Sequence, residues 1–201
     1  MLYTCRMAGV LDDLPPSKEE LAFHWKSGRL CLDFVATVGE RWRRSFERLR
    51  TPEDLEGWIA ATGCFRTRAP VSATQLQAAR ELREAVNRLA RPGLAQQRGD
   101  RRLVNAWAAR PAPAPQLTAE NEIAWSAPRP AEAIFSGVAR DAVDLLAGPL
   151  AGRIRECAAK DCALLFVDAS RPGRRRWCAT EACGNRERTK AYRARRLKEP
   201  R

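Results

Sequence analysis

Four cysteines in two close pairs constrain the fold of this chain more than any other feature of its sequence. The pairs are Cys157-x4-Cys162 and Cys178-x4-Cys183, and fifteen residues separate them. Two pairs of thiolates joined by a short loop can close a tetrahedron around one zinc ion. The spacing therefore predicts one structural Zn2+ per chain, bound by all four cysteines. Because four thiolates leave no coordination position for water, hydrolytic zinc chemistry is not expected.

Two other uses of paired cysteines fit the sequence less well. Structural disulfides need an oxidising compartment, and nothing in the chain indicates secretion. Redox-active thiols usually occur as CxxC beside a βαβ pattern, which this chain lacks. We therefore interpret the two pairs as metal ligands.

The segments around the cysteines follow the order of a treble-clef zinc finger. We expect a strand over residues 164–167, a turn over 170–173 and a return strand over 175–177. Residues 185–197 are predicted to form a helix with Asn185 as its N-cap. A cysteine knuckle, a hairpin and then a helix that carries the last ligand make up this type of finger.

Positive charge is concentrated in the same region. Residues 151–201 contain 15 Lys+Arg and 6 Asp+Glu, so they carry +9 of the net charge of +12. Twelve of these fifteen cations are arginine, which binds phosphate through two parallel hydrogen bonds. A basic surface of this kind is typical of proteins that bind polyanions. The alternative is a solvated face, since arginine is abundant throughout, with 31 Arg against 5 Lys.

A longer motif around the second cysteine pair resembles a known family. From Phe166 to Arg186 the chain reads F-x-D-x-S-R-x-G-x-R-R-W-C-x4-C-G-N-R, which resembles the CGNR zinc finger. Residues 28–38, GRLCLDFVATV, resemble the start of the ABATE domain, although Ala36 stands where that family usually has asparagine. The ABATE domain precedes this finger in stress-induced transcriptional regulators of bacteria. The resemblance covers about residues 23–196 and implies a DNA-binding regulator of transcription.

Ahead of the finger, the apolar pattern predicts a mostly helical domain with one small β-hairpin, which places the chain in the α+β class. The expected helices cover residues 52–62, 74–91, 101–109 and 131–147, and the hairpin strands cover 116–118 and 121–126. The expected core consists of Trp58, Leu82, Val86, Phe135, Val138 and Leu145. The expected parts are a flexible tail over 1–22, an ABATE-like helical domain over 23–148 and a CGNR-type zinc-finger DNA-binding domain over 150–201.

Apolar residues also recur at helical spacing over residues 30–39 and 41–50, so both segments are expected to be helical. Asp33 lies among the apolar residues of the first segment. We expect it to be a buried, hydrogen-bonded carboxylate, with a ligand contact as the alternative. His24 is the only histidine, and we expect it to be packed or at the surface rather than to bind metal.

The basic C-terminal helix suggests how the finger binds double-stranded DNA. Arg186, Lys190 and Arg193 lie at i, i+4 and i+7, on one helix face. We expect Arg186 and Lys190 to read base edges, with a hydrogen bond to the zinc thiolates as the alternative for Arg186. The residues expected to contact phosphate are Arg174, Arg175, Arg176, Arg195 and Arg196. One finger covers few base pairs, so tight binding is expected to need a homodimer. The N-terminal domain is expected either to form this dimer or to sense a small-molecule effector.

Other function classes find less support in the sequence. No apolar run approaches the roughly 20 residues that span a bilayer, and no signal-peptide pattern is visible, so we expect a cytoplasmic, nucleoid-associated protein. No phosphate-binding glycine loop and no catalytic pair of carboxylates is recognisable, so an enzyme is not expected. Beside DNA binding, two alternatives remain open: an RNA-binding module and a protein-interaction module, each with a structural zinc finger.

Overall fold

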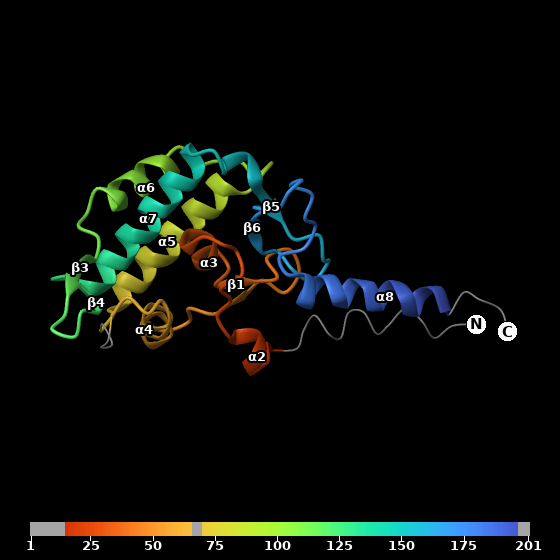
Figure 1. Ribbon diagram of the computed structural model, residues 1–201, viewed down its shortest axis with the longest axis horizontal. Coiled ribbons are helices and arrows are strands. Elements are labelled where there is room, and N and C mark those ends of the chain that lie inside the picture. Colours follow the sequence, from red (N-terminus) through yellow and green to blue (C-terminus); the bar gives the residue numbers. More distant parts are fainter. Residues whose placement is uncertain (1–14, 66–69, 197–201) are drawn as a thin grey trace.

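The computed structural model describes residues 15–65 and 70–196 (Figure 1). The α-helices of that part are α2 (Lys18–Leu21), α3 (Leu30–Val35), α4 (Pro52–Ala61), α5 (Ala73–Ala90), α6 (Asp100–Ala108), α7 (Pro130–Ala147) and α8 (Asn185–Arg196). The strands form the antiparallel pairs β1 (Val38–Gly39) with β2 (Phe46–Glu47), β3 (Ala114–Leu117) with β4 (Ile123–Ser126), and β5 (Ile154–Glu156) with β6 (Leu165–Val167). A 3-10 turn, η1 (Ala151–Arg153), and a π-helical turn, η2 (Thr180–Gly184), complete the described elements.

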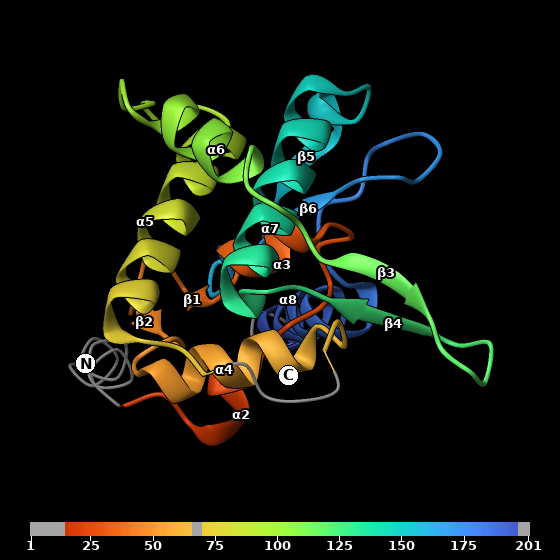
Figure 2. The ribbon, with the colours of Figure 1, turned by 90° about the vertical axis from the view of Figure 1, so that its left-hand side faces the viewer.

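Two helices of 18 residues each, α5 and α7, form the centre of the helical part. The short helix α3 packs against both, α6 lies along them, and α4 crosses one end (Figure 2). The predicted core is confirmed, since its members are all buried: Trp58, Leu82, Val86, Phe135, Val138 and Leu145. The apolar faces that recur every 3.6 residues on α5 and α7 therefore pack against each other, as the sequence pattern indicates.

Helix-capping residues explain where two of the predicted helices, α4 and α5, begin. Thr51 Oγ1 accepts a hydrogen bond from Asp54 N, and the Asp54 carboxylate accepts one from Thr51 N at 2.9 Å. Ser72 and Gln75 make the same reciprocal pair at the start of α5. These side chains satisfy backbone N–H groups that have no partner inside the helix, a stabilisation of about 1 kcal/mol for each cap. The predicted start of α4 is thus confirmed, and α5 begins one residue before its predicted start.

Between α3 and α4 the chain differs from the sequence prediction. The helix predicted over residues 30–39 ends early, at the C-terminus of α3, and the helix predicted over 41–50 is absent. Instead, Ser45 N donates to Glu40 O, and the chain turns back so that β2 pairs with β1. Glu40 and Ser45 have positive φ angles of 43° and 47°, which an α-helix does not accept. Both helix predictions are wrong at this point because apolar spacing alone does not reveal these turns.

The predicted N-terminal tail, residues 1–22, contains one short helix in its described part. Ser17 Oγ accepts from Glu20 N at 3.3 Å, and the Glu20 carboxylate accepts from Ser17 N at 2.8 Å, so α2 is capped in the same way as α4. Residues 1–14, and with them Cys5, lie outside the described residues.

The β3–β4 hairpin carries an exposed apolar face. Pro115 lies opposite Trp125, and Leu117 lies opposite Ile123. Because alternate residues of a strand share a face, these four side chains lie together on one side of the hairpin. Leu117 is 75% exposed and Ile123 is 68% exposed. In Figure 2 the hairpin extends away from the helices, so this face is not part of the helical core.

The C-terminal part is joined to the helical part through the β5–β6 pair. Ile154, Leu165 and Val167 belong to the same buried cluster as the helices. From this base, α8 projects away from the rest of the protein, and none of its residues is buried (Figure 1). Among the described helices, none combines the length and the apolar character needed to cross a membrane.

We expect Val86→Asp to unfold the helical part, because Val86 is fully buried in the apolar core. An unpaired buried carboxylate costs several kcal/mol, a large fraction of the stability of a domain of this size. Circular dichroism during thermal unfolding would measure the loss.

Val143→Asp is the matched control, because Val143 lies on α7 and is 39% exposed. Its effect should stay within about 0.5 kcal/mol. An unchanged Tm for Val86→Asp would show that α5 presents a different face to the core.

Candidate metal centre and basic helix

The four cysteines predicted to bind zinc lie together. Their Sγ atoms are all within 4.8 Å of one another. The Cys162 and Cys178 Sγ atoms are 3.9 Å apart, and the Cys178 and Cys183 Sγ atoms are 3.6 Å apart. A tetrahedron with Zn–S bonds of about 2.3 Å has sulfur–sulfur edges of about 3.8 Å. The cluster therefore has the dimensions of a zinc site with four cysteine ligands.

Backbone hydrogen bonds hold the cysteine segments in register. Cys157 N donates to Leu164 O at 3.0 Å, which extends the β5–β6 pair up to the first ligand. Ala158 N donates to Arg176 O at 2.8 Å and joins the two cysteine segments. Cys178 N lies 3.5 Å from Cys157 Sγ and donates to it. The sulfur atoms are thus placed by the fold of the backbone around them.

The hairpin next to the metal site is not the predicted one. The strand predicted over residues 164–167 is confirmed as β6, but its partner is β5, which precedes the first cysteine. Residues 175–177 form no strand, so the predicted return strand is wrong. The reason lies in the backbone, because Arg175 N donates to the Asp168 carboxylate instead of entering a strand ladder.

Asp168 organises the loop that leads to the second cysteine pair. This residue is 0% exposed; one carboxylate oxygen accepts from the backbone N and hydroxyl of Ser170, and the other accepts from Arg175 N. The hydrogen bond from the Ser170 hydroxyl lowers the pKa of Asp168, with further help from these backbone N–H groups. At Gly173, φ is +75°, a backbone conformation that residues with a side chain rarely adopt, so the turn favours glycine. These contacts give a physical reason for the D-x-S and G positions of the motif.

Helix α8 continues directly from the last ligand. The π-helical turn η2 carries Cys183 and runs into α8 without a break. Asn185 has a helical φ of −65°, and its Nδ2 donates to Glu181 O at 3.2 Å. The prediction of Asn185 as N-cap is therefore wrong, because the helical turn begins before it.

One carboxylate connects α8 to the first cysteine pair. Asp161 Oδ1 accepts from Arg186 Nη2 at 2.8 Å, and Asp161 Oδ2 accepts from Lys190 Nζ at 3.2 Å. Arg186 Nη2 also lies 3.4 Å from Cys183 Sγ. Burial raises the pKa of Asp161, but the hydrogen bond from Lys190 and the charge of Arg186 outweigh it, so the pKa lies below its ordinary value. Asp161 is thus ionised at neutral pH and anchors both cations.

The other residues predicted to bind nucleic acid fall into two groups. The exposed members are Arg174, Arg176, Arg193, Arg195 and Arg196. Arg175 differs, since it donates to Trp177 O at 3.0 Å and to Cys178 O at 2.9 Å. Its guanidinium also lies over the Phe166 ring, 4.3 Å from the centroid. Arg175 therefore supports the second cysteine segment from within the finger.

Arg91, at the end of α5, links the metal centre to the helical part. Its Nη2 donates to Ala163 O at 2.8 Å, next to the first cysteine pair. Its Nη1 lies 2.7 Å from Glu156 Oε1, an ion pair without hydrogen-bond alignment. The guanidinium also lies 4.9 Å from the centroid of the Trp42 ring. Sequence reasoning assigned no role to Arg91 or Asp161, because their partners lie far away along the chain.

Asp33 and His24 lie outside the cysteine cluster. Asp33 Oδ1 accepts from Ser27 N at 3.0 Å, in agreement with a buried, hydrogen-bonded carboxylate. Burial raises the pKa of Asp33 above its ordinary value. A ligand contact for Asp33 stays a prediction. His24 Nε2 lies 3.3 Å from Arg48 Nη2, so the ring is packed against a neighbour, as expected.

Two family models match the chain, in the order that the motifs predict. The ABATE model, described as "Putative stress-induced transcription regulator", matches residues 28–149, and the CGNR zinc finger model matches residues 153–196. No curated protein matches the chain. The second match and the sulfur–sulfur distances agree, so the cluster of Cys157, Cys162, Cys178 and Cys183 holds one structural zinc ion.

Removal of zinc is expected to unfold the finger and to leave the helices α4, α5 and α7 folded. Structural zinc contributes about 10–16 kcal/mol of apparent free energy in small fingers. Cys178→Ser should therefore lose the metal together with the structure of residues 157–196. Metal analysis and circular dichroism of the purified protein would measure both.

Cys64→Ser is the control, because Cys64 is half-buried and lies outside the cluster. It should retain one zinc per chain. A folded finger in protein that contains almost no metal would contradict the assignment.

Proposed function

We propose that this chain, which belongs to the ABATE family and carries a CGNR zinc finger, regulates transcription by binding double-stranded DNA through the finger. The main support for this proposal is that α8 is exposed and rich in positive charge. This helix of 12 residues projects from the zinc site, buries none of its side chains and carries its cations on an accessible surface (Figure 1). A rigid, exposed, basic helix is a common way to enter the major groove.

The electrostatics of the finger support a nucleic-acid partner. Residues 151–201 carry +9 of the net charge of +12. Zinc with four thiolates subtracts about two charges, which leaves the region strongly positive. Such a surface gains affinity for DNA by releasing condensed counterions.

The contacts of the cations suggest a division of roles. We assign the phosphate contacts to the exposed arginines Arg174, Arg176, Arg193, Arg195 and Arg196. Arg186 and Lys190 are bound to Asp161, so their first role is to hold α8 against the metal site. This geometry favours the anchoring role of Arg186 over direct base reading. Arg171 is also exposed in the loop before the second cysteine pair and joins the phosphate-contacting group.

Dimerisation through the N-terminal part is the second element of the proposal. It is supported by the apolar face of the β3–β4 hairpin, where Leu117 and Ile123 lie side by side and exposed. A pair of fingers would double the DNA contacts of one copy. Sedimentation of the protein and of Leu117→Lys would test this, and a monomer at all concentrations would exclude it.

RNA binding and protein interaction are the competing functions of the same basic surface. A shape-specific RNA binder would prefer structured RNA to duplex DNA at equal salt. A protein-interaction module would bind both only weakly at physiological salt. Affinities for duplex DNA and structured RNA, measured side by side, separate the three functions.

Two arginine variants test the division of roles. We expect Arg195→Ala to weaken binding equally for every DNA sequence and to reduce the salt slope by about one unit, because it removes one phosphate contact. We expect Arg186→Ala to weaken binding for every sequence as well, and in addition to release zinc more readily, because its guanidinium contacts Cys183 Sγ. Fluorescence anisotropy on a selected site and on random DNA, together with a zinc assay, measures both effects.

A different result for Arg186→Ala would indicate that Arg186 contacts a base edge. In that case zinc is retained, and the loss of about 1–3 kcal/mol is confined to the selected site.

A further inference from the structure

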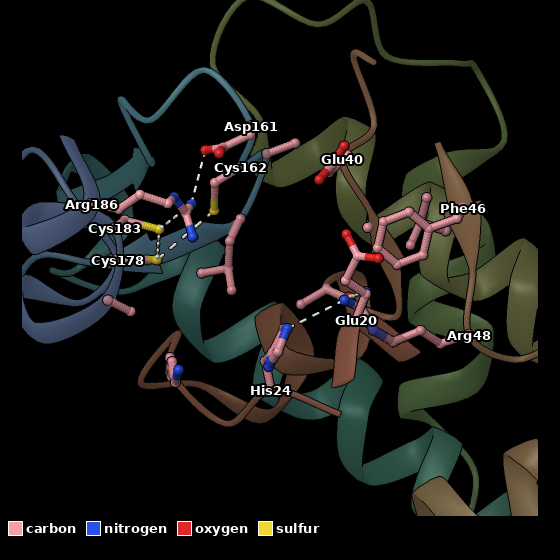
Figure 3. A pocket seen from close by; sticks show the side chains of 17 residues that line it. Glu20, His24, Glu40, Phe46, Arg48, Asp161, Cys162, Cys178, Cys183 and Arg186 are labelled. Atoms are coloured by element: carbon pink, nitrogen blue, oxygen red, sulfur yellow. Dashed lines mark hydrogen bonds and ion pairs between the residues drawn. The ribbon is translucent and has the colours of Figure 1, made fainter. Parts of the chain in front are cut away.

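A cavity of about 280 Å³ lies where the helical part meets the zinc finger. One wall comes from α2, β1, β2 and their flanking residues, and the other includes Cys162, Cys178 and Cys183. Figure 3 shows the labelled cysteines on one side of the cavity and Arg48 on the other. A molecule in this cavity would therefore contact both parts of the chain.

Arg48 is a buried cation in the wall of this cavity, with 5% of its surface exposed. Its Nε donates to Ala22 O at 3.0 Å, and its Nη1 donates to Ala36 O at 2.8 Å. Its Nη2 lies 3.3 Å from His24 Nε2. Burial lowers the pKa of His24 to about 4, so the neutral ring accepts this bond from a group that can only donate. Three of the five N–H groups of Arg48 thus have neutral acceptors, and two remain.

The unmatched charge of the cavity wall is positive. The acidic side chains of the wall are paired with other cations: Glu20 with Arg44, Glu40 with Arg43 and Arg44, and Asp161 with Arg186. Within residues 15–65 and 70–196, Arg48 and Lys26 have no ion-pair partner. The zinc–thiolate cluster adds about two negative charges on the far wall. An anionic group is therefore favoured at the Arg48 end and disfavoured at the cysteine end.

The wall next to Arg48 has an apolar part beside the polar side chains of Glu20 and His24 (Figure 3). The Arg48 guanidinium stacks on Phe46, 4.8 Å from the ring centroid. Gly39 allows this packing, because a Cβ atom there would lie 2.3 Å from the Phe46 ring and 2.9 Å from Arg48 Nη1. Val38 and Leu164 line the cavity as well. The site thus combines one cationic end with an apolar body, a combination typical of small-molecule pockets.

We propose that this cavity binds a small organic carboxylate. The remaining N–H groups of Arg48 hold the carboxylate through charge-assisted hydrogen bonds, and Lys26 adds its charge at the rim. The apolar part of the molecule lies against Phe46 and Leu164. The volume restricts the ligand to a compact molecule, since drug-sized ligands occupy about 300–1,000 Å³. This site goes beyond DNA binding and does not depend on it.

Occupation of the cavity has a second consequence at the zinc site. The ligand covers the face of Cys162, Cys178 and Cys183 that borders the cavity. A chelator then reaches the metal more slowly. Ligand binding also stabilises the folded state, because the ligand does not bind the unfolded chain. The proposal therefore predicts two readouts that are independent of DNA.

The experiment compares each carboxylate with its neutral amide on the full, zinc-loaded chain. The probes are butyrate against butyramide and benzoate against benzamide. We expect a carboxylate of this panel to raise Tm saturably and to slow zinc transfer to a chromophoric chelator, while its amide does neither. Arg48→Gln should weaken the response about tenfold or more, as the loss of a charged hydrogen bond does. Lys26→Gln should weaken it severalfold.

Lys18→Gln is the matched control, because Lys18 is an exposed cation on α2 outside the cavity wall. It should respond as the unchanged protein does. If Arg48→Gln does not fold, the comparison of Lys26→Gln with Lys18→Gln decides. Equal effects of amide and carboxylate, no effect of any probe at millimolar concentration, or a rise in Tm without slower zinc transfer would each overturn the proposal.

Discussion

The C-terminal part of this structure depends on the gathering of four cysteine sulfur atoms around one zinc ion. The buried cluster around the metal site combines the four cysteines with a small set of apolar residues: Ala36, Ala159, Leu164, Phe166 and Trp177. Without metal, four thiolates at these distances would repel one another. With metal, the same thiolates join the β5–β6 pair, the loop organised by Asp168 and the turn that starts α8. Metal binding and folding of the finger are therefore one equilibrium.

Two polar contacts extend this arrangement in opposite directions. Asp161 connects the first cysteine pair to Arg186 and Lys190 on α8. Arg91 connects the same knuckle, through Ala163 O, to the end of α5. The orientation of the basic helix is thus tied to the helical part through side chains around the metal. The cavity lined by Arg48 lies at the same junction, so a molecule bound there would contact both parts of the chain.

The features that could be predicted from the sequence are those that depend on residues close together in the chain. The apolar stripes of α5 and α7 and the cap at Thr51 depend on neighbours in the chain, and the structure confirms them. The cysteine spacing identified all four metal ligands. The segment after α3 could not be predicted, because the positive φ angles at Glu40 and Ser45 override an apolar spacing that resembles a helix. The roles of Asp161 and Arg91 could not be predicted either, since each has a partner at least 25 residues away.

We propose that zinc holds α8 in the position in which it binds DNA. The most direct test is the affinity for duplex DNA at several salt concentrations. It is measured on one preparation of the protein that is zinc-loaded, then stripped of zinc, then reloaded. We expect tight binding with a steep salt dependence in the loaded protein, loss of affinity after stripping, and recovery on reloading. Equal affinity and equal salt dependence of the loaded and stripped protein would contradict it.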